Sequence, residues 1–177
     1  MPENENGIKS AELPAAYRWV YSHTALCAFL KGADIASVIL VAVAYAAGLA
    51  YALVCSPLLF AELLALTFVP FVCVSLIRKK INAPRPYELY DFAAAGLPSP
   101  GKKSGSSFPS RHVFSAFLIG SLFCFFCPAA GAAVLALGAL LALCRAVLGV
   151  HFIRDVVSGA LLGAVLGVVG GLIIILI

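Results

Sequence analysis

Long runs of apolar residues, separated by short polar stretches, set the pattern of this chain. Five runs can be recognised, and they cover about residues 34–55, 58–78, 112–127, 131–147 and 153–177. Most of them have close to the roughly 20 residues that an α-helix needs to cross the hydrocarbon core of a bilayer. The pattern therefore predicts about five transmembrane helices.

The segment before the first run is more polar. Residues 13–32 mix aromatic side chains such as Trp19 with charged side chains such as Arg18. This mixture favours an amphipathic helix in the membrane interface, with its aromatic rings at the level of the lipid headgroups. A sixth transmembrane span over the same residues is the alternative. We therefore divide the chain into an N-terminal polar and interfacial segment, 1–33, and a transmembrane domain, 34–177.

Composition places the chain in the same class. Hydrophobic residues make up 63% of the 177 residues and charged residues only 11%, whereas a soluble domain carries about 25% charged residues. We therefore predict an all-α fold, a polytopic membrane helical bundle. The basic residues lie beside the apolar runs and not on a separate polar domain, so we expect the lipid bilayer, and not a nucleic acid, as partner.

The polar stretches can be assigned to the two faces of the membrane. Residues 79–111 form the one long polar segment, and their content of Pro, Gly, Ser and Lys predicts an extramembrane loop. The chain changes face with each apolar run, so the end of run 58–78, the start of run 112–127, the end of run 131–147 and the start of run 153–177 all lie on the same face as this loop. All twelve Lys and Arg residues map to that face or to the N-terminal segment, so the positive-inside rule predicts a cytoplasmic face. Several of these cations are also candidates for catalysis, which weakens the rule.

Three polar clusters lie on that face. Ionisable groups beside a bilayer are costly, so their presence indicates a functional site. Together the clusters supply cations, a hydroxyl, two histidines and one carboxylate, a set that suits phosphoryl transfer through a histidine. They run from Arg78 to Arg85, from Ser110 to His112 and from Arg145 to Asp155.

The arginines are candidates for a phosphate clamp. A planar guanidinium makes two parallel, charge-assisted hydrogen bonds to an oxyanion, and Arg85 and Arg145 are the strongest candidates for this role. For the basic run Arg78, Lys79 and Lys80, the alternative is that the side chains extend to lipid headgroups.

The two histidines of the clusters predict the chemistry. His112 follows Ser110 at a predicted helix start, where free N–H groups and a hydroxyl can bind an anion; simple helix capping is the alternative. His151 and Asp155 lie four residues apart, so in a helix the carboxylate would hold one ring nitrogen and leave the other free to attack. No complete set of metal ligands accompanies them, so we expect neither a metal ion nor another cofactor.

The clusters resemble the motifs of the type 2 phosphatidic acid phosphatase (PAP2) superfamily of membrane lipid-phosphate phosphatases. That family has a lysine followed after six residues by Arg-Pro, then Pro-Ser-Gly-His, and then Ser-Arg, five residues, His, three residues and Asp. The resemblance covers about residues 34–170. In this chain the matching stretches are, in order, Arg78 to Pro86, Pro109 to His112 and Cys144 to Asp155.

The resemblance implies a role for each matched residue. His151 would attack phosphorus and form a phosphohistidine, and Asp155 would orient His151 and stabilise its charged form. His112 would protonate the leaving oxygen and then activate water for the second step. The phosphoryl oxygens would be held by Arg85, Ser110 and Arg145.

The chain departs from the family pattern at three positions. Arg78 stands where the family has lysine, and Lys79, one residue out of register, is the alternative first-motif cation. Arg111 replaces the glycine of the second motif, and we hypothesise that it contacts a second phosphate and favours a diphosphate substrate. Cys144 replaces a serine. The predicted phosphate-binding set is thus Arg78, Arg85, Ser110, Arg111 and Arg145.

The sequence therefore predicts an integral-membrane, metal-independent lipid phosphatase. Small bacterial members of the family often act on undecaprenyl diphosphate, and this short chain resembles those members. Phosphatidic acid or phosphatidylglycerol phosphate is the alternative substrate, and a catalytically silent lipid-phosphate binder or transporter is the alternative of another class. The family precedent places the active face of a plasma-membrane enzyme outside the cytoplasm, in conflict with the count of basic residues. The oligomeric state stays open.

Overall fold

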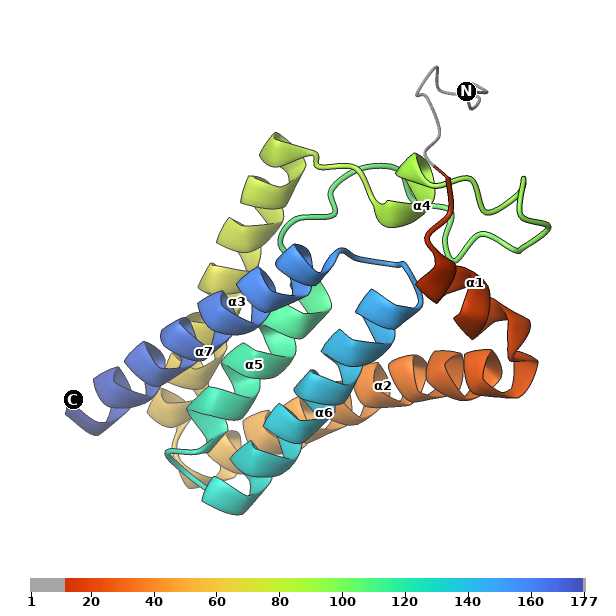
Figure 1. Ribbon diagram of the computed structural model, residues 1–177. Coiled ribbons are helices and arrows are strands. Elements are labelled where there is room, and N and C mark those ends of the chain that lie inside the picture. Colours follow the sequence, from red (N-terminus) through yellow and green to blue (C-terminus); the bar gives the residue numbers. More distant parts are fainter. Residues whose placement is uncertain (1–11, 177) are drawn as a thin grey trace.

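The computed structural model describes residues 12–176, and the regular elements in that range are all helices (Figure 1). Residues 1–11 of the predicted N-terminal segment and residue 177 lie outside the described residues. Four helices are long and apolar enough to cross a membrane, which confirms the predicted class of polytopic membrane bundle: α2 (Thr24–Cys55), α3 (Pro57–Ile81), α6 (Pro128–Val147) and α7 (Ile153–Leu176). The shorter ones are α1 (Ala15–Ser22), α4 (Pro86–Leu89) and α5 (Arg111–Phe123).

Helix α5 takes the place of the predicted third span, but it is shorter than predicted. Its 13 residues rise only about 20 Å, because Cys124 to Phe126 turn the chain and Pro128 starts α6. The helix is enclosed by α2, α3, α6 and α7, and side chains such as Val113 and Phe114 are fully buried. Since other helices cover it, α5 has little surface to present to lipid and does not need the full length of a span.

The N-terminal segment differs from the single interfacial helix predicted over residues 13–32. Helix α1 ends at Ser22, His23 interrupts the helical backbone with φ −97° and ψ 83°, and α2 then continues to Cys55. Nδ1 of His23 lies 2.8 Å from the carbonyl oxygen of Trp19, which holds the ring against the end of α1. A separate sixth span is not formed, because the eight residues of α1 rise only about 12 Å. A position of α1 in the interface stays a prediction.

Helix α2 is longer than the membrane requires. Its 32 residues rise about 48 Å, compared with about 30 Å for the hydrocarbon core, and it runs without a break through the predicted boundary at residues 33 and 34. Helix α1 packs against the N-terminal end of α2 (Figure 1). There Tyr21 is buried and donates a hydrogen bond of 3.1 Å to the carbonyl oxygen of Leu148. Helix α1 is thereby fixed to the turn that carries the third motif.

The helix ends that bear the three motifs lie together at one end of the bundle, at the top of Figure 1. The count of turns predicts this arrangement. Asn82 ends α3 in the left-handed conformation (φ 46°), and its Oδ1 accepts a hydrogen bond of 3.2 Å from the Ser106 amide. The Ser107 amide donates to the carbonyl oxygen of Ala83 at 2.9 Å. The loop before α5 is therefore folded across the end of α3.

Glycines along one side of α7 allow it to approach α5 closely. A Cβ atom on Gly159 would lie 2.6 Å from the carbonyl oxygen of Ser110, and one on Gly167 would lie 2.5 Å from that of Leu118. One on Gly163 would lie 2.9 Å from the Leu118 amide nitrogen. Small residues four apart are a common device for packing helices in membranes. Here the contact fixes the second motif, at the start of α5, against the third motif, at the start of α7.

A Gly163→Ala substitution is expected to destabilise this contact. The added methyl group would meet backbone atoms of α5, and overpacking of this kind costs about 1–3 kcal/mol. Gly32→Ala is the matched control, since a Cβ on Gly32 of α2 meets nothing within 4 Å. Thermal unfolding in detergent should show a lower midpoint for Gly163→Ala and no decrease for Gly32→Ala. Equal midpoints would contradict the close packing of α5 on α7.

Candidate active site

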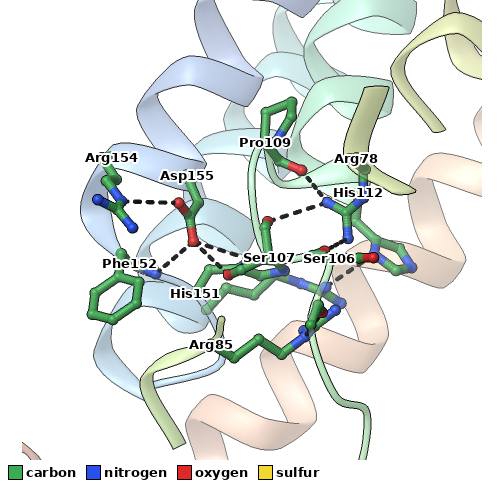
Figure 2. Close-up of polar contacts among 12 residues, drawn as sticks. Arg78, Arg85, Ser106, Ser107, Pro109, His112, His151, Phe152, Arg154 and Asp155 are labelled. Atoms are coloured by element: carbon green, nitrogen blue, oxygen red, sulfur yellow. Dashed lines mark hydrogen bonds and ion pairs between the residues drawn. The ribbon is translucent and has the colours of Figure 1, made fainter. Parts of the chain in front are cut away.

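His151 lies in the turn between α6 and α7 (Figure 2). Its side chain is almost completely buried, at 2% exposed. Gly149 shapes this turn with φ 72°. The amides of Val150 and His151 donate to the carbonyl oxygen of Arg145 at 3.0 and 3.1 Å. These bonds close the end of α6, so the third motif is held together by its own backbone.

A carboxylate and a hydroxyl face Nδ1 of His151. Nδ1 lies 3.7 Å from Asp155 Oδ2 and 3.2 Å from Ser107 Oγ. Ser107 donates in turn to Asp155 Oδ2 at 2.5 Å. Because the hydroxyl hydrogen points to Asp155, the hydroxyl oxygen accepts the hydrogen bond from Nδ1–H of His151. Ser107 therefore links the histidine and the carboxylate that the sequence pairs (Figure 2).

This arrangement sets the protonation of His151. With the proton on Nδ1, Nε2 keeps its lone pair free for attack. Burial lowers the pKa of His151 from its ordinary value of 6.5, and the opposing effect of the nearby Asp155 carboxylate is smaller. The imidazole therefore stays neutral and nucleophilic to a lower pH than an exposed histidine does.

Asp155, in the first turn of α7, makes polar contacts with the loop before α5 and with its own neighbours in the chain. Its side chain is fully buried, and besides Ser107 it accepts a hydrogen bond of 3.1 Å from the Phe152 amide. Its Oδ1 lies 3.5 Å from Nε of Arg154. The Ser110 amide donates to the Asp155 carbonyl oxygen at 2.8 Å. The third motif is thus connected to the loop before α5 through a side chain and to the second motif through the backbone.

His112 enters the site from α5 and meets Arg145 of α6. Its Nδ1 lies 2.9 Å from Nη1 of Arg145. A guanidinium only donates hydrogen bonds, so Nδ1 accepts, and neutral His112 carries its proton on Nε2. His112 and His151 lie close enough to interact electrostatically. The two neutral histidines thus hold opposite tautomers: His151 presents a lone pair at Nε2, whereas His112 presents an N–H group there.

Arg78 and Arg85 both bind the loop that carries Ser107. Arg85 is buried, and its Nε donates to the carbonyl oxygen of Gly105 at 3.1 Å. Arg78 is also buried, and its guanidinium donates to three carbonyl oxygens in residues 106–109 (Figure 2). Arg78 therefore supports the loop backbone, which the sequence does not predict. Phosphate binding by either arginine stays a prediction.

The remaining predicted phosphate ligands lie at the start of α5. Ser110 is fully buried, and its Oγ has no hydrogen-bond partner in the part of the chain that the structure describes. The guanidinium of Arg111 lies 5.3 Å from the ring centre of Phe71 and borders a polar cavity of about 340 Å³. Arg78 and Lys79 line the same cavity, and the choice between them as the first-motif cation stays a prediction.

Three residues of the site have no place in the sequence prediction. Ser107 links His151 to Asp155, Asp34 forms an ion pair with Arg145, and Glu88 accepts hydrogen bonds from the same loop. Asp34 had a signal, because it is the one carboxylate in the apolar sequence of α2, and such residues indicate function. The sequence carries no such signal for Ser107 and Glu88, because a loop serine and a loop glutamate acquire their partners only when the chain folds.

Two histidines in a buried site rich in arginine, at one end of a membrane bundle, define a phosphoryl-transfer enzyme that works at the bilayer. Comparison with known families gives the same answer. Residues 41–174 match the PAP2 superfamily. The chain belongs to this superfamily, and the predicted enzyme class, a hydrolase of lipid phosphates, is confirmed.

One solved structure extends the comparison to the fold. The chain is similar to Aquifex aeolicus LpxE, seen in a crystal structure, with a TM-score of 0.65 and 21% sequence identity. The similarity covers 92% of this chain and 98% of that chain, and at this identity it shows a shared fold. A search of curated proteins found no match to the chain.

Proposed function

We propose that the protein hydrolyses an isoprenoid diphosphate, such as undecaprenyl diphosphate, through a phosphohistidine and without a metal ion. One observation carries the proposal: Nδ1 of buried His151 is held by Ser107 and Asp155, which leaves Nε2 free. Arg85 and Arg145 lie close enough to act on the charge of His151. Their positive charge lies where phosphoryl oxygens would collect negative charge during transfer.

The proposed reaction consists of two displacements at phosphorus. In the first, Nε2 of His151 bonds to phosphorus, the bond to the leaving oxygen breaks, and His112, which has first taken up a proton from solvent to become an imidazolium, gives that oxygen a proton. In the second, His112 takes a proton from water, the water oxygen bonds to phosphorus, and the phosphorus–nitrogen bond breaks to release phosphate. Between the two steps Asp155 stabilises the positive charge on the ring of His151.

An apolar cavity beside His112 supports a lipid substrate. It has a volume of about 370 Å³ and lies between α2, α3 and α5. Side chains such as Val41, Phe68 and Leu118 line it together with His112. We infer that the lipid tail lies in this cavity and directs its phosphate toward His112. An isoprenoid chain and an acyl chain both suit such a lining, so the choice of lipid depends on the headgroup.

The polar cavity at Arg111 favours a diphosphate headgroup. The cations Arg78, Lys79, Lys103 and Arg111 line it, and no carboxylate belongs to this lining in the described residues. Positive charge of this kind raises the local concentration of anions, and a second phosphate would add the charge that this cavity attracts. Phosphatidic acid or phosphatidylglycerol phosphate is the alternative substrate.

The test is phosphate release by the purified protein in detergent with EDTA present. We expect release to survive EDTA and undecaprenyl diphosphate to be a better substrate than phosphatidic acid. Arg111→Gly should lower the ratio of kcat/KM for the diphosphate over that for the monophosphate by about 10- to 100-fold, since it removes a charge-assisted hydrogen bond. An unchanged ratio would count against the role of Arg111. No release from either lipid by folded protein would favour the silent binder or transporter.

We also propose that the protein lies in the plasma membrane with this site outside the cytoplasm. The family precedent supports this orientation, whereas the twelve basic residues of the chain support the opposite one. Labelling of Lys103→Cys with a membrane-impermeant thiol reagent in intact cells, above the signal of the unsubstituted chain, distinguishes the two. Labelling agrees with the proposal, and its absence points to a cytoplasmic site.

A further inference from the structure

Arg145 is held from two sides by residues of two other helices. Asp34 of α2 places Oδ1 at 2.8 Å from Nε and Oδ2 at 3.3 Å from Nη2. His112 of α5 lies 2.9 Å from Nη1. The side chains of Arg145 and Asp34 are only 10% and 19% exposed, so solvent screens this ion pair weakly. Three helices therefore meet at one guanidinium.

Asp34 lies before the stretch of the chain that matches the superfamily model. The family match begins at residue 41, and the first of the three motifs begins at Arg78. The nearest charged residue in α2 is Lys31, and no other carboxylate occurs in that helix. A lone carboxylate in an apolar helix is costly, so its retention calls for a partner and a role.

The donors of Arg145 can be counted. A guanidinium has five N–H donors: one hydrogen-bonds Asp34 and one His112, and Nε lies 2.8 Å from Oδ1 of Asp34 as an ion-pair contact without the geometry of a hydrogen bond, which leaves one N–H on each terminal nitrogen. Asp34 thus fixes the plane of the guanidinium from the Nε side. In that plane Nη1 reaches Nδ1 of His112, which settles the His112 proton on Nε2, and two N–H groups stay available for an oxyanion.

Charge balance gives Asp34 a second effect on Arg145. Asp34 attracts Arg145, whereas Arg85 repels it, and Arg111 and Arg78 add to the positive charge around His112. Without the Asp34 carboxylate, like charges would dominate around the guanidinium, and its long side chain would be free to turn away from His112.

We propose that Asp34 is a positioning residue, which holds Arg145 so that the guanidinium fixes the tautomer of His112 and faces the phosphoryl group. Asp34 itself touches no reacting atom and acts through Arg145. The inference rests on the proposed function only for the part that concerns the phosphoryl group. The tautomer of His112 can be measured whether or not the lipid substrate is known.

The kinetic test compares Asp34→Asn with the wild-type protein. The amide keeps the shape of the carboxylate and removes its charge, so kcat/KM should fall about 10- to 100-fold, the equivalent of one charge-assisted hydrogen bond. Glu62→Gln is the matched control, because Glu62 lies in α3 about 24 Å along the helix from Arg78, and its rate should equal that of the wild type. Asp34→Glu retains the charge and should lose less than Asp34→Asn. Equal losses in the two variants would overturn the positioning role.

The second test reads the His112 ring directly. In protein labelled with ¹⁵N on its histidine rings, His112 should appear as the Nε2–H tautomer in the wild type and lose this preference in Asp34→Asn. The chain has three histidines, so His23→Ala and His151→Ala assign the signals. An unchanged His112 signal in folded Asp34→Asn overturns the inference, even if the proposed reaction is wrong. If instead His151→Ala abolishes phosphate release while Asp34→Asn matches the wild type, the inference fails and the proposed function stands.

Discussion

A His151→Ala variant is expected to release no phosphate above background. The variant lacks the nucleophile, and loss of a catalytic nucleophile lowers kcat by up to about 10⁶-fold in enzymes that use one. Folding should be retained, because among the described residues 12–176 the side chain of His151 makes its polar contacts with Ser107 and Asp155 alone. The measurement is release of inorganic phosphate in detergent with EDTA present, with the thermal midpoint recorded on the same sample.

His23→Ala is the matched control for this prediction. The side chain of His23 is exposed, and its contacts within the described residues are with its neighbours Trp19 and Ser22, so the variant should keep the wild-type rate. Quenching in alkaline denaturant with phosphorus-labelled substrate adds a direct readout, since a phosphohistidine is stable in alkali: label should stay on the wild-type protein and be absent from His151→Ala. Labelled His151→Ala would assign the phosphohistidine to another residue.

An Asp155→Asn variant is expected to have the second-largest effect, a loss of about 10⁴-fold in kcat, as for the carboxylate of a serine-protease triad. Oδ2 of Asp155 accepts hydrogen bonds from Ser107 and from the Phe152 amide. An asparagine that turns its oxygen to these donors loses the negative charge opposite His151. An asparagine that turns its NH₂ group toward Ser107 and the Phe152 amide places a hydrogen-bond donor opposite two other donors, so these bonds are lost. In both cases the ring of His151 loses the support for its charged form.

The readout for Asp155→Asn is kcat for phosphate release, with Asp91→Asn as the matched control. Asp91 is a loop carboxylate that accepts a hydrogen bond of 2.8 Å from the Ala94 amide, and its replacement should leave the rate unchanged. A thermal midpoint close to that of the wild type would show that the loss is chemical. A rate within tenfold of the wild type would mean that Ser107 alone orients His151.

The sequence predicts those helices whose length and apolar composition are required by contact with lipid. The long helices α2, α3, α6 and α7 must each present about 20 apolar residues to the bilayer, and hydropathy detects such runs. The break at His23 is a change of backbone angles at one residue, and hydropathy carries no trace of it. The short length of α5 also escapes prediction, because it depends on the helices that enclose this one.

The candidate site shows the same division. His112, His151 and Asp155 are recognisable from local spacing, and the fold brings them together. Ser107 and Asp34 are not, because Ser107 binds residues 44 and 48 positions away and Asp34 binds one 111 positions away. Contacts over such separations are visible only once the chain has folded.

The enclosure of α5 has a consequence for how the protein tolerates different bilayers. A bilayer that is too thick or too thin makes lipid-facing helices tilt, and the surface that would feel this stress belongs mainly to the long helices α2, α3 and α7. Helix α5 is shielded from it, and the Ser110–Asp155 backbone bond and the close contact at Gly159 tie its first turn to α7. When α7 tilts, α5 moves with it, and the histidine pair keeps its geometry while the membrane thickness changes.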